Sequence, residues 1–237
     1  EILSNPVKTI QTGEYTVYLE PAALNEIIDM MSWGGFSYKS NKIGTSPLHL
    51  LNKKERTLSK SISINENIKD GLSPNFNSDG FIKPEVINMI SNGKFVESLT
   101  SPRSSLEYSV THNSSSTSEY PCSIDMGAGN LEDSAILSTI NNGLYISNLW
   151  YLNFSDRNNG RMTGLTRFGC FLIENGKLTS PINTMRFDDS VYSMLGTNLI
   201  GLTTNRDLLI DSGTYEERST ASARLPGAII NNFKMTL

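Results

Sequence analysis

The chain has 237 residues, 38% of them hydrophobic, which is enough to bury a core in one large or two small domains. Its formal net charge of −4, without a basic stripe, argues against nucleic-acid binding, and no apolar run approaches the length of a membrane span. There is no signal-peptide pattern, and the two cysteines define no disulfide framework, so we expect reduced thiols and a cytoplasmic protein.

The first predicted elements are a hairpin and a helix. Residues 7–10 and 15–19 alternate apolar and polar side chains around a glycine, which predicts two paired strands. Residues 21–33 then change to helical periodicity, with Pro21 suited to the first turn and a pair of glycines suited to the end. The apolar face of this helix is expected to comprise Leu24, Ile27, Ile28 and Met31.

The next part of the chain is polar and mixed. Residues 59–64 alternate well enough for a short strand, and residues 81–99 predict a hairpin around Asn92 and Gly93. Residues 53–56 form a basic cluster, Lys-Lys-Glu-Arg. Given the acidic balance of the chain, we interpret this cluster as a solvated face rather than a nucleic-acid contact.

The remaining elements outside the centre of the chain are a loop, two helices and a strand. Residues 112–120 are polar and of low complexity, which predicts a mobile loop. Residues 129–143 and 190–198 carry apolar residues at helical spacing. Residues 228–230 and 233–237 indicate a last strand.

The segment of residues 143–189 is the densest in aromatic, glycine and charged residues. Residues 149–154 predict a strand with large side chains on both faces, and a polar turn follows. Residues 161–173 predict a second strand, in which two glycines indicate bulges or close backbone approaches. Asn175 and Gly176 then favour a tight hairpin turn.

Motifs of known catalytic chemistry are missing. The two histidines, His49 and His112, lack the one-turn spacing of a zinc protease helix. No G-x-S-x-G elbow and no Walker A lysine occur, so the glycines are interpreted as structural. Cys170 lies in an apolar strand without a nearby histidine, which favours a buried, inert thiol over a nucleophile.

Two polar constellations remain as candidates. The adjacent carboxylates Asp188 and Asp189 could bind a metal or act as acid and base, but we favour a helix-capping role. The other set is Arg157, Arg161 and Arg167. Arg161 and Arg167 share parity along a strand, which places them on one face unless the glycines shift the register, so surface charge and substrate binding both stay open.

Several of these segments together resemble the C-terminal domain of the TldD/PmbA family, zinc peptidases and their inactive homologues that are also known as modulators of DNA gyrase. The matching features are the GLYI strand entry at residues 143–146, the G-x-x-T-G segment at residues 160–164, and the I-E-N-G-K-L-x-x-P hairpin at residues 173–181. Residues 14–23 also fit, as a strand that leads into the first helix. The resemblance covers most of the chain and is strongest over residues 143–202.

The resemblance implies a branch within this family. Its catalytic members carry H-E-x-x-x-H on the first helix and a later zinc-binding cysteine, whereas residues 22–31 of this chain contain no histidine. The chain therefore resembles the PmbA, or TldE-like, members, which act beside a zinc-bearing TldD-like paralogue. The family's N-terminal domain is missing from residues 1–237, and Glu1 in place of a methionine is typical of a piece of a longer protein.

These lines combine into one set of expectations. The fold is predicted to be α+β and β-dominated, with curved antiparallel sheets and two or three helices. The expected function is that of a non-catalytic subunit of a heterodimeric peptidase, without zinc of its own, that helps to degrade or trim unfolded peptides. Arg161, Thr163 and Arg167 are the candidate contacts for peptide or partner. A homodimer, an atypical peptidase using Asp188, Asp189 and a histidine, and a protein-contact modulator of DNA gyrase or of a toxin are the alternatives.

Overall fold

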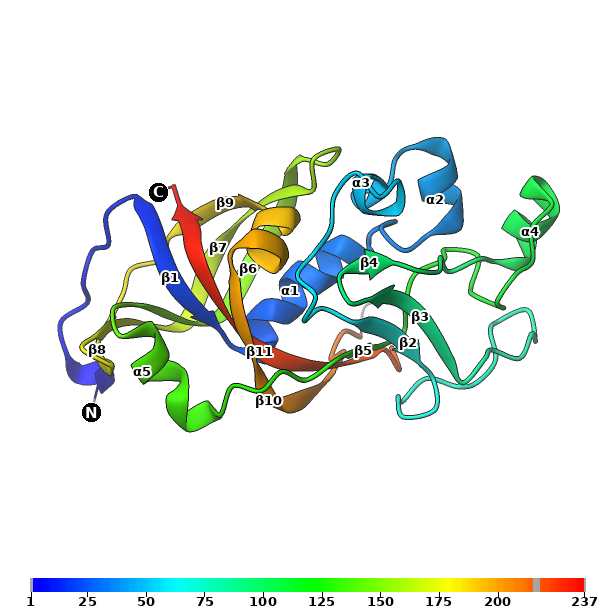
Figure 1. Ribbon diagram of the computed structural model, residues 1–237. Coiled ribbons are helices and arrows are strands. Elements are labelled where there is room, and N and C mark those ends of the chain that lie inside the picture. Colours follow the sequence, from blue (N-terminus) through cyan, green and yellow to red (C-terminus); the bar gives the residue numbers. More distant parts are fainter. Residues whose placement is uncertain (1, 215–217, 237) are drawn as a thin grey trace. The chain divides into compact units, whose positions relative to one another are not determined.

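The computed structural model describes residues 2–214 and 218–236 and confirms a β-dominated α+β fold (Figure 1). Contacts divide the chain into two compact units. The first comprises the residues up to Met30, Ala128–Arg206 and the segment from Pro226 onward, and the second comprises Met31–Gly127 and Asp207–Leu225. The strand pairing is mixed rather than wholly antiparallel, and the described residues form more helices than the two or three expected.

Within the described residues, five strands of the first unit close into a ring. They are β1 (Gly13–Leu19), β6 (Gly143–Asp156), β7 (Arg161–Glu174), β9 (Arg186–Ser190) and β11 (Ser222–Met235). β1 pairs with β6 in parallel and with β11 in antiparallel orientation, and the ring continues through β7 and β9 back to β11. Closure removes the unpaired backbone edges that an open sheet of these strands would present.

Large apolar side chains pack between β9 and β11. Phe187 of β9 and Phe233 of β11 are fully buried, with ring centroids 5.1 Å apart. Helix α1 (Pro21–Ser32) follows β1, and the residues predicted for its apolar face are 0% exposed, so this helix prediction is confirmed: Leu24, Ile27, Ile28 and Met31. The short strand β8 (Lys177–Pro181) pairs with β7 after the turn at Asn175 and Gly176.

Several local predictions for the first unit were wrong or incomplete. The predicted N-terminal hairpin does not form, because β1 pairs with β6 and β11 and only Lys8 makes an isolated bridge, to Ile182. The predicted helix over residues 129–143 is reduced to short helical segments, η2 (Asp133–Ala135) and α5 (Ile136–Ile140).

The C-terminal segments also differ from the predictions. The predicted helix over residues 190–198 is a short π-helix, η3 (Ser193–Thr197). The strand β10 (Leu199–Ile210), which pairs with β11, was missed. The last strand is confirmed but begins earlier, at Ser222, and Leu237 lies outside the described residues.

The second unit has its own strand order, in which the start of β11 is followed by β5 (Ser123–Met126), β2 (Ile64–Asn67), β3 (Val86–Ser91) and β4 (Lys94–Phe95). The hairpin around Asn92 and Gly93 is confirmed, with both residues at positive φ. The short strand predicted for residues 59–64 begins only at Ile64.

The helices of the second unit are α2 (Tyr38–Ile43), α3 (His49–Asn52) and α4 (Pro102–Tyr108). The polar loop of residues 112–120 is anchored rather than free, because Glu119 is only 2% exposed. Its carboxylate accepts hydrogen bonds from Ser37 and Ser101, the residues that cap the N-termini of α2 and α4. No described helix is long and apolar enough to cross a membrane.

Candidate functional site

The three predicted contact residues lie on the outward face of β7. Arg161, Thr163 and Arg167 alternate with buried neighbours along the strand. Gly164 does not shift this register, because residues 161–165 pair without interruption with β9. The expectation that Arg161 and Arg167 share one face is therefore confirmed, whereas their role in binding stays a prediction.

Arg161 and Thr163 are occupied by the pairing of β7 with β9. The guanidinium of Arg161 forms an ion pair with the carboxylate of Asp188, and both side chains are partly exposed. The hydroxyl of Thr163 donates a 2.7 Å hydrogen bond to the carbonyl oxygen of Phe187. These two residues therefore support the strand pair more than they offer free groups to a ligand.

The predicted capping role of Asp188 and Asp189 was wrong. Both residues lie in β9, so their side chains leave the strand on opposite faces. Asp189 is 1% exposed, its Oδ1 accepts a 2.7 Å hydrogen bond from the amide of Ser190, and its Oδ2 has no partner among the described residues. Burial raises the pKa of Asp189. A carboxylate pair that faces apart cannot hold one metal ion or share one proton.

Arg167 lies in a different environment, between two exposed aromatic rings. Its guanidinium carbon is 4.2 Å from the centroid of the Trp150 ring and 5.0 Å from that of Phe168. We name Trp150, Arg167 and Phe168 the Arg167 cluster. Trp150 is 48% exposed and Phe168 73% exposed, so the cluster presents apolar and cationic surface to solvent. Arginine and large aromatic residues of this kind carry much of the binding energy in protein interfaces.

Two bulges shape the surface around this cluster. Tyr151 in β6 and Phe168 in β7 have φ angles of 55° and 61°, and the pairing of the two strands shifts at both places. Bulky residues rarely adopt positive φ, and such strained positions concentrate at functional sites. Tyr151 is 78% exposed. The sequence indicated large side chains on both faces here, but the bulges decide which rings reach solvent.

The third arginine of the predicted set, Arg157, does not join the Arg167 cluster. Its guanidinium lies over the ring of Phe154, 4.7 Å from the centroid. The structure thus gives each of the three arginines a different partner. Of these, only Arg167 combines cation–π contacts with strongly exposed aromatic rings.

Helix α1 takes the place where the family resemblance puts the zinc-binding helix. Its ionisable residues are Glu26 and Asp29, and burial followed by the charge of Asp29 raises the pKa of Glu26. Zinc sites use at least three ligands, usually imidazole or thiolate. No three side chains of His, Cys, Asp and Glu among residues 2–214 and 218–236 are grouped so as to hold a metal ion. The residues present do not fit a zinc site, and we derive no chemical step through one.

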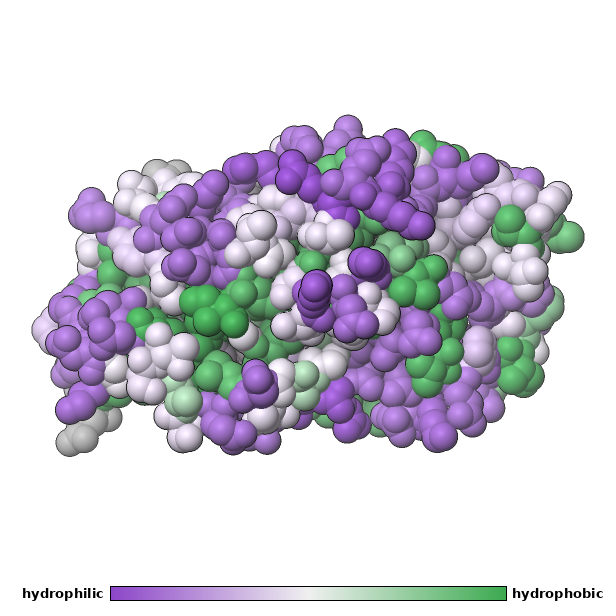
Figure 2. Space-filling model, in the orientation of Figure 1, coloured by the Kyte–Doolittle hydropathy of each residue, from purple (hydrophilic) through white to green (hydrophobic). Residues whose placement is uncertain are grey.

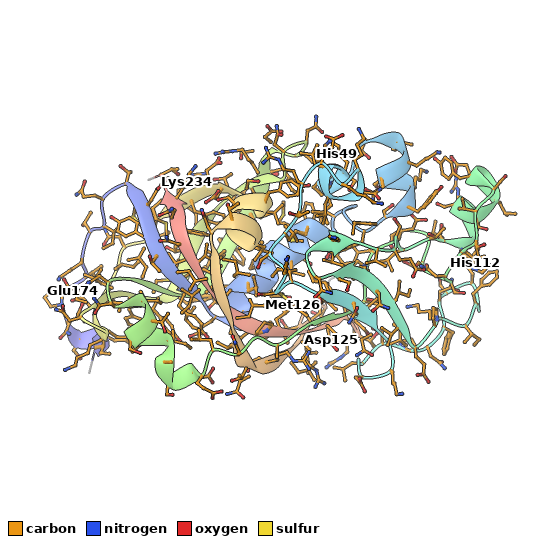
Figure 3. The ribbon with its side chains drawn as sticks, viewed as in Figure 1. His49, His112, Asp125, Met126, Glu174 and Lys234 are labelled. Carbon is orange, nitrogen blue, oxygen red and sulfur yellow. The ribbon has the colours of Figure 1, made fainter. Side chains whose placement is uncertain are left out.

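The other candidate metal ligands are also unsuited. His49 on α3 and His112 in the loop before β5 lie well apart in the second unit (Figure 3). Cys170 is 4% exposed, and its thiol donates to the carbonyl oxygen of Arg167. Burial raises the pKa of Cys170, in agreement with a buried, unreactive thiol.

The fold defines a strand-rich α+β domain whose helix α1 contains no histidine. Residues 12–237 match the family model of the PmbA/TldA metallopeptidase C-terminal domain. The chain therefore belongs to the PmbA/TldD family. Among curated proteins, none matches this sequence.

Solved structures support the same fold. TldE from Thermococcus kodakarensis superposes with a TM-score of 0.80 at 16% identity, over 100% of this chain and 53% of that one. A Thermotoga maritima protein described as a modulator of a DNA gyrase gives a TM-score of 0.78 at 15% identity, over 97% of this chain and 51% of that one. A Bacteroides thetaiotaomicron protein with a similar description gives a TM-score of 0.75 at 18% identity, over 97% of this chain and 48% of that one. The chain thus spans about half of each of these proteins.

Proposed function

We propose that this chain is the non-catalytic, PmbA/TldE-like part of a peptidase whose zinc is held by a TldD-like paralogue. The observation that carries the proposal is α1, the helix to which the family resemblance assigns zinc binding, because its ionisable side chains are the carboxylates Glu26 and Asp29. Such a helix supplies no imidazole to a metal ion, so catalysis is assigned to the partner. The chain would then help to bind unfolded peptides for degradation or trimming, in the cytoplasm.

The Arg167 cluster is the surface that we assign to the paralogue. Trp150 and Phe168 offer apolar area on both sides of a cation, which suits a partner with apolar residues and a carboxylate. Arg161 and Thr163 contribute indirectly, because their bonds to Asp188 and Phe187 hold β7 against β9. Contact by two copies of this chain is the competing assembly.

The test is hydrolysis of an unfolded peptide by this chain alone, by the paralogue alone, and by the two mixed. We expect hydrolysis to require the mixture and to stop when a chelator removes zinc. Chelator-sensitive hydrolysis by the purified chain alone would overturn the proposal. A matched pair of variants locates the contact: Arg167→Ala should weaken association of the two proteins, whereas Lys177→Ala, which removes an exposed cation of β8, should not.

A second candidate function, modulation of DNA gyrase by protein contact, is favoured by the descriptions of two structural neighbours. The same Arg167 cluster would serve it. Direct capture of gyrase by the purified chain, lost in Arg167→Ala, would favour this function over the peptidase role. An atypical peptidase built on Asp188, Asp189 and a histidine has less support, because the two carboxylates face apart and Asp189 is buried.

A further inference from the structure

A groove in the second unit is lined by Lys54 and Arg56 of the basic cluster and by the β3–β4 hairpin. It has a volume of about 700 Å³. Its lining includes four cationic and three apolar side chains: Lys54, Arg56, Lys60, Lys94, Leu51, Phe95 and Val96. Figure 2 shows strongly hydrophilic residues over α3, with hydrophobic residues beside them near β4. The sequence placed part of this cluster on a solvated face, but folding adds Lys60 and Lys94 to it.

The charge of the groove is of one sign. None of the acidic residues within 2–214 and 218–236 lines it, although the whole chain carries a net charge of −4, and Glu55 lies between two of the cations in sequence. Among the described residues, none of the four cations forms an ion pair. Four unpaired cations around one concave surface repel one another, and an anionic ligand would relieve that repulsion.

The walls of the groove are fixed to each other by backbone hydrogen bonds. The amide of Leu58 donates a hydrogen bond to the carbonyl oxygen of Gly93 at 2.9 Å. The amide of Gly93 donates a hydrogen bond to the carbonyl oxygen of Ile62 at 2.7 Å. The approach is so close that a Cβ on Gly93 would lie 2.3 Å from the oxygen of Leu58. The segment after α3 is therefore tied to the turn of the hairpin, and the groove is formed before any ligand arrives.

The backbone of β4 adds a second kind of recognition. β4 is the last strand in the order of this unit. Ser91 pairs with Lys94 across a two-residue turn, and the amide of Val96 donates to Met89 at 2.9 Å. In an antiparallel strand pair, a residue that lies between two hydrogen-bonded residue pairs points its amide N–H and its carbonyl oxygen away from the neighbouring strand. Phe95 therefore presents a donor and an acceptor on the outer edge of β4, where an extended peptide can pair.

We propose that this groove binds an extended acidic peptide segment, with carboxylates on the four cations, an apolar side chain on Phe95 and Val96, and backbone pairing to β4. This inference rests on the proposed function, since it names the class of peptide that the chain holds. Single-stranded nucleic acid is the less suited ligand, because Phe95 is the one aromatic side chain that the described part of the chain places in the lining for bases to stack on.

The test is fluorescence anisotropy with the chain alone and a labelled peptide of alternating Glu and Val. We expect binding that weakens as salt rises and that falls about tenfold or more in the double variant Lys60→Glu/Lys94→Glu. The matched control is Lys42→Glu/Lys177→Glu, which changes net charge equally at exposed positions outside the lining and should leave affinity unchanged. A peptide methylated on alternate amide nitrogens should bind more weakly if the pairing to β4 is correct.

Three outcomes would overturn the proposal: equal binding of a peptide with Lys or Gln in place of Glu, tighter binding of an oligothymidine strand, or equal loss in both double variants. Hydrolysis is not part of the readout, so the result is separate from the proposed function. Acidic-peptide binding without hydrolysis in the mixture would refute only the peptidase role. Hydrolysis in the mixture without acidic-peptide binding would refute only the groove.

Discussion

The carboxylate of Glu119 accepts a 2.6 Å hydrogen bond from the hydroxyl of Ser37, the residue that caps the N-terminus of α2. The same carboxylate also accepts from the amides of Lys39 and Ser101, at 3.0 and 2.8 Å. One buried anion thus stabilises the beginnings of two helices, because helix N-termini carry unpaired amides and a partial positive charge. The loop of residues 112–120, which its composition predicts to be mobile, therefore holds the N-termini of α2 and α4 in place.

Replacing Glu119 by Ala should destabilise the chain by about 3 kcal/mol, since charged hydrogen bonds are lost and buried donors stay unpaired. Urea unfolding measures this as a lower midpoint at unchanged slope. Glu132→Gln, at an exposed acid, is the control and should change the midpoint little. An Ala variant as stable as the parent would show that the loop does not hold the two helices.

The same residue predicts a pH dependence. Burial alone would raise the pKa of Glu119, but the hydrogen bonds from Ser101, Ser37 and Lys39 outweigh burial and lower it. The folded state therefore binds this proton less readily than the unfolded state. Its stabilising contribution should be complete above the pKa of an unfolded glutamate and should be lost as pH falls through the folded value. In Glu119→Gln this part of the acid dependence of stability should be missing.

Asp189 predicts a pH dependence of stability that is opposite in sign to that of Glu119. Burial raises its pKa, so the folded state binds the proton more readily than the unfolded state, and stability falls as pH rises from the unfolded pKa to the folded pKa. Asp189→Asn keeps an oxygen for the amide of Ser190 and removes the buried charge. It should be at least as stable as the parent at neutral pH, with a flatter profile in a series of thermal melts. Marked destabilisation by Asn would mean that a charge at this position is required.

Asp188→Asn provides the comparison for Asp189. It removes an ion pair with Arg161 in which both side chains are partly exposed, so the expected loss is under about 1 kcal/mol.

Gly164→Ala should destabilise the first unit by about 1–3 kcal/mol through overpacking. A Cβ at this position would lie 2.8 Å from a methyl carbon of Leu152 and 2.9 Å from the ring of Phe187, which is fully buried. Gly201→Ala is a matched control in β10, because no atom lies within 4 Å of the added carbon. Thermal unfolding of the two variants measures the difference. Equal midpoints would show that Phe187 can move aside without cost.

Replacing Arg167 by Lys should weaken association with the paralogue, although the positive charge is kept. Lysine keeps the charge but lacks the planar guanidinium that lies over Trp150 and Phe168. We expect an unchanged melting temperature, because the cluster is exposed, and weaker association with the paralogue by about threefold to tenfold. In a Trp33→Phe background the emission of Trp150 reports the contact directly. A Lys variant that associates as tightly as the parent would reduce the role of Arg167 to its charge.

Local chemistry made some elements predictable. The turns at Asn92–Gly93 and Asn175–Gly176 have positive φ at all four residues, and these residue types tolerate such angles without outside help. Helix α1 was predictable because its apolar spacing and its proline act within a few residues. The fold class follows from the sum of such signals.

What the sequence did not reveal is set by contacts between distant segments. β1 pairs with residues near 145 and near 230, whereas its alternating pattern equally suits a local hairpin. Tyr151 and Phe168 adopt positive φ although their types disfavour it, so tertiary packing imposes the bulges that expose them. The run from Leu199 to Ile210 shows no regular alternation of apolar and polar residues, so β10 had no clear strand signal, and it directly follows the helix predicted over residues 190–198.

The ring of the first unit has a consequence for biosynthesis. Its first strand and its last strand are neighbours, paired from Gly13 with Met235 to Leu19 with Ala228. A ribosome releases these partners far apart in time, so β1 must wait for β11 with its edge exposed, and the contact that closes the ring has a high loop-closure cost. Chains stalled before residue 226 should therefore be recognised by chaperones and proteases as unfinished, whereas the second unit has most of its strands available much earlier.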